Sequence, residues 1–158
     1  MPTVEERTRT LNSLLRGELS AIETYEQALV QVANEPGVGD LRHIAEEHRQ
    51  AAEVLRRHIV ERGGKPSADS GAWGTVVRTV EGAAKLFGNS SALEVLKTGE
   101  QHGVNSYESA LRDENLDEPC KELIRSTLLP QTQAHLPVLD RFLSGQDREA
   151  ATAPAPPR

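Results

Sequence analysis

The chain has 158 residues, a formal net charge of −6 and a single cysteine, and only 3% of its residues are aromatic. One cysteine excludes an internal disulfide, and the interspersed acidic and basic residues exclude a basic nucleic-acid-binding surface. The N-terminus carries no apolar leader and no apolar run reaches the length of a membrane span. We therefore expect a cytoplasmic protein that binds neither membranes nor nucleic acid.

Two long helices are predicted in the first 62 residues. The first covers residues 4–33 and opens at Thr3, with Glu6 three residues later, which is the pattern of a capping box. The second covers residues 40–62 and ends at a Gly-Gly pair beginning with Gly63. In both segments apolar residues recur every three or four positions, as on the buried face of a helix.

Three further helices are predicted after a loop rich in Ser, Gly and Asp. A short amphipathic helix covers residues 73–87, and its narrow apolar stripe is expected either to cap the bundle or to mediate homo-oligomerisation. The next helix covers residues 91–114, with Ser91 opening a second capping box. The last covers residues 118–145, with Asp117 as its N-cap.

These elements indicate one all-α domain over residues 1–148, followed by a flexible Ala- and Pro-rich tail over residues 149–158. The helices form two hairpins joined by a long connection, and we expect the hairpins to pack as a four-helix bundle with a long crossover.

The first and third long helices share an internal repeat. The pattern Gly-Glu-x6-Tyr-Glu-x-Ala-Leu starts at Gly17 and again at Gly99. A weaker similarity aligns the second and last long helices, and in this alignment Gln131 is the equivalent of His48. The chain is therefore expected to consist of two similar helical hairpins.

Helical periodicity places several polar side chains on the apolar faces of the helices, with Glu47 on a flank. The inward residues are Glu18, His48, Glu100, Gln131 and His135. Unpaired carboxylates are costly to bury, so they need a cation or protonated partners. Two interpretations remain open: a metal site with carboxylate and imidazole ligands, or a metal-free hydrogen-bonded network that includes the tyrosines of the repeat.

The spacing of Glu18 and Tyr25 on the first helix, with Glu100 on the third and Gln131 on the fourth, resembles the ferritin-like superfamily. The similarity is greatest to a small bacterial ferritin-like family of unknown function. The resemblance implies a ferritin-like four-helix bundle, and it implies iron or another divalent metal as cofactor. With iron, it implies ferrous oxidation or peroxide removal as the reaction class.

The chain departs from that family pattern because it has no Glu-x-x-His on the second or fourth long helix. The implied ligands are Glu18, Glu100 and Gln131, completed by Glu47 or His48, with His135 as a further candidate. Such a set suits one ion better than two. The alternative is a metal-free bundle that serves in binding or in homo-oligomerisation.

Overall fold

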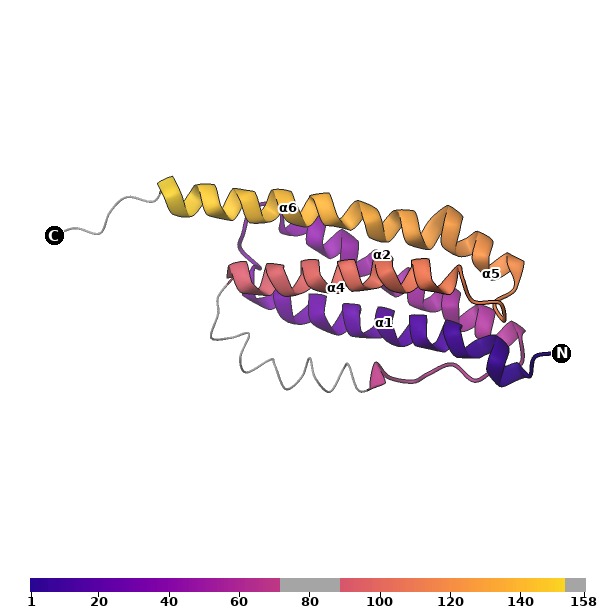
Figure 1. The fold of residues 1–158 in the computed structure, drawn as a ribbon. Coiled ribbons are helices and arrows are strands. Elements are labelled where there is room, and N and C mark those ends of the chain that lie inside the picture. Colours follow the sequence, from indigo (N-terminus) through magenta and orange to yellow (C-terminus); the bar gives the residue numbers. More distant parts are fainter. Residues whose placement is uncertain (72–88, 153–158) are drawn as a thin grey trace.

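A computed structural model describes residues 1–71 and 89–152, with side chains placed for residues 1–71 and 92–145. The described residues form helices and no strand, which confirms the all-α class (Figure 1). The elements are α1 (Val4–Gln31), α2 (Val38–Glu61), α4 (Asn89–Ala110), α5 (Glu118–Leu123), the π-helical turn η1 (Ile124–Leu128) and α6 (Leu129–Thr152).

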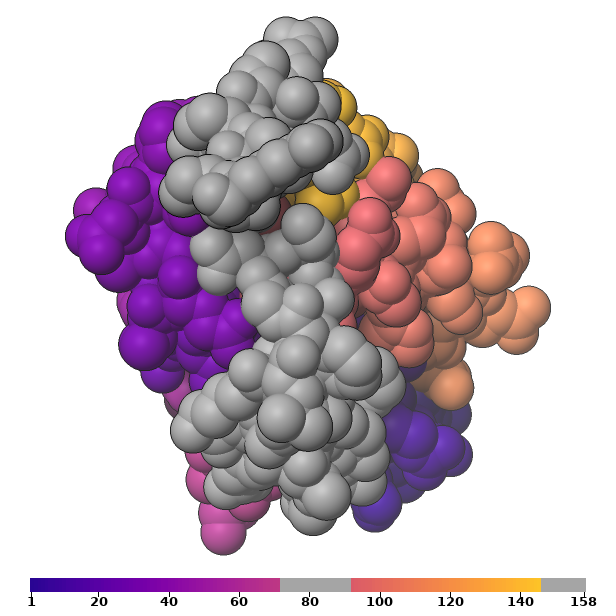
Figure 2. Space-filling model, turned by 90° about the vertical axis from the view of Figure 1, so that its left-hand side faces the viewer, coloured from indigo at the N-terminus to yellow at the C-terminus, as the bar shows by residue number. Residues whose placement is uncertain are grey.

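The four long helices form a bundle of two antiparallel hairpins (Figure 1). Helix α1 packs on α2 and α4, and α6 packs on α4 and α2. Viewed along the bundle, α4 and α6 lie together on the right of the molecule and the purple part of the first hairpin lies on the left (Figure 2). Because every long helix touches two neighbours, a side chain that points inward can meet side chains from the other hairpin.

Local sequence signals fix the starts of α1 and α5. Thr3 and Glu6 form the expected capping box on α1, and Asp117 accepts a hydrogen bond from the backbone N–H of Cys120 at the start of α5. Helix α4 begins at Asn89, two residues before the expected Ser91.

The last helix continues to Thr152, beyond the predicted end near residue 145. The predicted helix over residues 73–87 lies outside the described residues. So does the end of the predicted tail, residues 153–158.

The connection between the hairpins first runs back along α1. Asn12 binds the backbone of Lys65 and Ser67, and Ser70 donates a hydrogen bond to Glu23. Later residues of the connection thus contact later residues of α1, from Asn12 to Glu23. The connection therefore runs along the bundle axis in its first part, as a long crossover requires. No helix in the described part of the chain has the length and apolarity needed to span a membrane.

The interior contains two apolar clusters with a polar layer between them. One cluster is centred on Leu11, Leu15 and Leu55, and the other on Tyr25 and Leu41. On α1 and α2, Glu18 and His48 lie between the residues of the two clusters, and both side chains are buried. The layer therefore lies at mid-height, where solvent cannot satisfy charged groups and only neighbouring side chains can.

The π turn η1 changes which residues of α6 face the core. It ends where the N–H of Leu129 donates to the carbonyl of Ile124, five residues earlier. A π turn accommodates one extra residue, so the inward positions after it move one residue along the chain. It ends two residues before Pro130, which has no N–H to donate. As a result, Thr132 and His135 face the core.

Candidate functional site

His48 is the centre of the polar layer. Its Nδ1 lies 2.6 Å from Oε2 of Glu18, and its Nε2 lies 2.7 Å from Oε1 of Glu100. All three side chains are buried. A single imidazole from α2 therefore bridges the two carboxylates that the repeat contributes from α1 and α4.

The two tyrosines of the repeat bind these carboxylates crosswise. Tyr25 on α1 donates to Oε1 of Glu100 at 2.6 Å, and Tyr107 on α4 donates to Oε1 of Glu18. Burial, together with the adjacent carboxylates, raises the pKa of both phenols well above the usual value, so both remain protonated donors. The repeat thus builds a pair of Glu–Tyr contacts between the hairpins.

His135 and Glu47 extend the layer toward the α2–α6 edge. The Nδ1 of His135 lies 3.1 Å from Oε2 of Glu100, and its Nε2 lies 2.9 Å from Oε2 of Glu47. The other oxygen of Glu47 lies 2.7 Å from Nε2 of His43, whose side chain is 74% exposed. The contacts therefore continue from the buried centre to the surface.

The carboxylates favour protonated histidines at this site. Burial alone would lower the pKa of His48, but Glu18 and Glu100 raise it to about 10. The pKa of His135 is raised in the same way by Glu100 and Glu47, against the effect of burial. Burial would raise the pKa of Glu100, yet hydrogen bonds from His135 and His48 lower it to about 2. Without a metal, the raised pKa values of both histidines favour imidazolium rings paired with the surrounding carboxylates.

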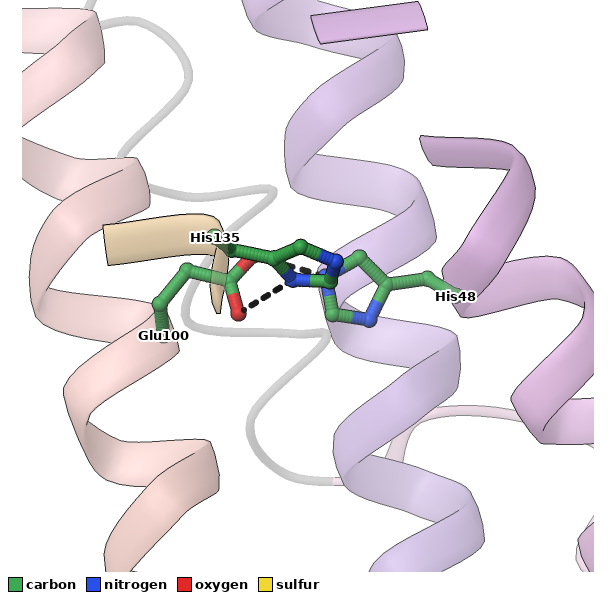
Figure 3. Close-up of side chains that lie close together, drawn as sticks. All are labelled: His48, Glu100 and His135. Atoms are coloured by element: carbon green, nitrogen blue, oxygen red, sulfur yellow. Dashed lines mark hydrogen bonds and ion pairs between the residues drawn. The ribbon is translucent and has the colours of Figure 1, made fainter. Parts of the chain in front are cut away.

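Three side chains in the layer have the composition and proximity of a metal site. One donor atom each from His48, Glu100 and His135 can be chosen so that all lie within 4.8 Å of one another. Figure 3 shows the three side chains converging from α2, α4 and α6. The rings of the two histidines lie 5.0 Å apart, centre to centre. Two imidazoles and a carboxylate could hold one divalent ion.

Five of the six predicted site residues meet in this layer. Glu18, His48, Glu100 and His135 are buried in it, and Glu47 joins at its edge. The sequence left Glu47 and His48 as alternatives, whereas the structure places both in the network at different depths. Metal binding by any of them stays a prediction.

The prediction that Gln131 lies at the centre of the core is wrong. Gln131 is half-buried and makes none of the hydrogen bonds of the layer, and its neighbour Thr132 is the buried residue. The extra residue in η1 rotates the following helix, so the alignment of His48 with Gln131 fails by one position. The sequence signal for this change is Pro130.

A cavity of about 310 Å³ lies between α1 and α4 on the other side of the layer. Glu18, Glu100 and Tyr107 contribute to its wall, together with Gly17. Ser20 also lines it, and its buried hydroxyl has no hydrogen-bond partner among the described residues. No pattern in the sequence predicts this cavity.

A sequence family described as a domain of unknown function, DUF2383, matches residues 6–113. The chain belongs to this family. No curated protein and no solved structure matches the chain. The matched region contains Glu18, His48 and Glu100, whereas His135 lies beyond it, so the family match includes only part of the layer.

Proposed function

We propose that this DUF2383 protein binds one divalent metal ion through His48, Glu100 and His135, with Glu18 as an additional oxygen donor. The convergence of three buried donor side chains from three helices carries the proposal. Two imidazoles with one carboxylate form the donor set of mononuclear non-haem iron(II) sites, which makes Fe²⁺ the favoured ion. The bundle with its long crossover supports the ferritin-like resemblance as well.

The residues fit one ion and do not fit a pair. A two-metal site of the ferritin-like kind takes a second carboxylate three residues before each histidine. Those positions are Ala45 and Thr132, both buried and without a carboxylate. A single bound ion would supply Lewis acidity to water or to a small ligand. The tyrosine donors would hold the carboxylates in place.

The proposal is tested by measuring metal content. The protein is purified without chelator, loaded anaerobically with Fe²⁺ or Co²⁺ and freed of unbound metal. We expect about one ion per chain, and a Glu100→Gln variant should weaken binding on the order of 100-fold. The matched control is Glu108→Gln, which alters an exposed carboxylate on the same helix and should bind normally.

Less than about a tenth of an equivalent in the loaded wild-type protein would refute the metal site. Equal binding by both glutamine variants would refute the ligand assignment while leaving metal binding intact.

The second candidate function is a metal-free frame for binding or oligomerisation. It is favoured by one observation: all four ring nitrogens of His48 and His135 lie 2.6–3.1 Å from a carboxylate oxygen. A doubly protonated pair satisfies the layer without any metal. Under this alternative, ¹⁵N NMR at neutral pH shows both rings as imidazolium, and adding Fe²⁺ or Zn²⁺ leaves the ring signals unchanged.

A further inference from the structure

The α2–α6 edge offers a continuous series of metal-ligating groups from solvent to the buried layer. His43 is 74% exposed, Glu47 is 18% exposed, and the side chain of His135 is 6% exposed. The heteroatom contacts are 2.7 Å from His43 to Glu47 and 2.9 Å from Glu47 to His135. The exposed fraction of the side chain therefore falls from His43 to Glu47 to His135, and each side chain contacts the next.

Glu47 uses its two oxygens in different directions. Oε1 faces His43, its neighbour one turn earlier on α2, and Oε2 faces His135 on α6. A carboxylate in this arrangement can bind a cation together with the outer histidine and then with the inner one. Imidazole and carboxylate are both ligands for Fe²⁺, Mn²⁺ and Zn²⁺, so each position along the series can hold the same ion.

We infer that His43 and Glu47 form a surface uptake pair, which captures a divalent cation and passes it to His135 at the buried site. This inference rests on the proposed metal site and adds the route by which the ion reaches it. The pair holds the ion only in transit. It shortens the distance over which a cation would otherwise travel without ligands through an apolar interior, where an unpaired charge is costly.

The cavity between α1 and α4 is the competing route, because Glu18 and Glu100 also line it. Its wall can be filled at Gly17, where a Cβ would meet no atom of a described neighbouring element within 4 Å. His102 lines the same cavity and is exposed, so it provides a histidine control for that side. The two routes can thus be blocked separately.

The test is stopped-flow absorbance of Co²⁺ binding to the full chain, combined with equilibrium titration. His43→Ala should slow association about fivefold or more, because the local capture of the ion is lost. Dissociation should slow by the same factor and Kd should stay unchanged, since a transit site lowers the barrier in both directions. Gly17→Leu and His102→Ala should bind at the wild-type rate, and thermal unfolding checks that each variant folds.

Three outcomes would overturn the inference. Unchanged rates in His43→Ala would exclude the uptake pair, and slower binding in Gly17→Leu alone would assign uptake to the cavity. Faster dissociation with a weaker Kd in His43→Ala would make His43 a ligand of the bound ion instead of a transit group. If the wild-type protein binds no Co²⁺ at all, the metal site itself fails, which is a different result from a change in rate.

Discussion

Raising the pH should destabilise the metal-free protein through His48. The folded-state pKa of His48 is about 10, against an ordinary value of 6.5. Between these values the folded chain holds a proton that the unfolded chain has released, so the free energy of unfolding falls as pH rises. The stabilisation is fully present below about pH 6.5 and is lost as pH passes through the folded pKa.

The size of the effect follows from the same shift. One pKa unit corresponds to about 1.4 kcal/mol, and the slope for one group reaches that value per pH unit. Between pH 7 and pH 9, His48 should therefore remove about 2–3 kcal/mol, and the raised pKa of His135 acts with the same sign. Burial raises the pKa of Cys120 from 9.0 to about 12, so this thiol also lowers the free energy of unfolding, beginning near pH 9 at the top of that window.

The assay is urea unfolding of chelator-treated protein at several pH values between 6.5 and 9, followed by circular dichroism. His48→Gln should be less stable than wild type at pH 7, because Glu18 and Glu100 lose a charged partner. Its stability should also vary less with pH. A wild-type free energy of unfolding that stays constant over this range, or the same slope in both proteins, would refute the imidazolium network.

Two further perturbations probe the layer. Tyr107→Phe removes the hydroxyl that donates to Glu18, so it should lower the free energy of unfolding by about 1–3 kcal/mol, and a loss below about 0.5 kcal/mol in urea unfolding would contradict the contact. Thr132→Glu places a carboxylate three residues before His135, so elemental analysis should find more than one ion per chain after loading. A stoichiometry that remains at one would show that this position cannot complete a second site.

Helical periodicity was sufficient to orient the polar residues of α1, α2 and α4. Glu18, His48 and Glu100 occupy positions where the 3.6-residue repeat requires inward side chains, and all three are buried. These helices contain no irregular turn between their caps and the layer, so counting along the sequence gives the correct face. The same reasoning gives the long crossover between the hairpins, because each hairpin has a short loop.

The 3.6-residue repeat gave the wrong inward residue in the last helix because that helix contains a π turn. Gln131 was expected inward, but η1 contains an additional residue and Thr132 takes that place. The pattern of Pro130 inside an apolar repeat indicates an irregular helix without specifying its form. The crosswise hydrogen bonds of Tyr25 and Tyr107 could not be predicted either. They depend on how far α1 and α4 are shifted along the bundle axis relative to each other, and no local sequence motif determines that shift.

The π turn also allows the last helix to contain an extra residue while the residues after it still face the core. The alignment with α2 implies one more residue before Thr132 than before His48, yet both residues remain buried. The surplus residue is absorbed within the five residues of η1, and His135 after it still faces the layer. In α2, which is α-helical throughout, one added residue would turn His48 by about 100° and remove it from Glu18 and Glu100. The last helix therefore carries an extra residue without loss of the contact between His135 and Glu100, which a regular helix could not do.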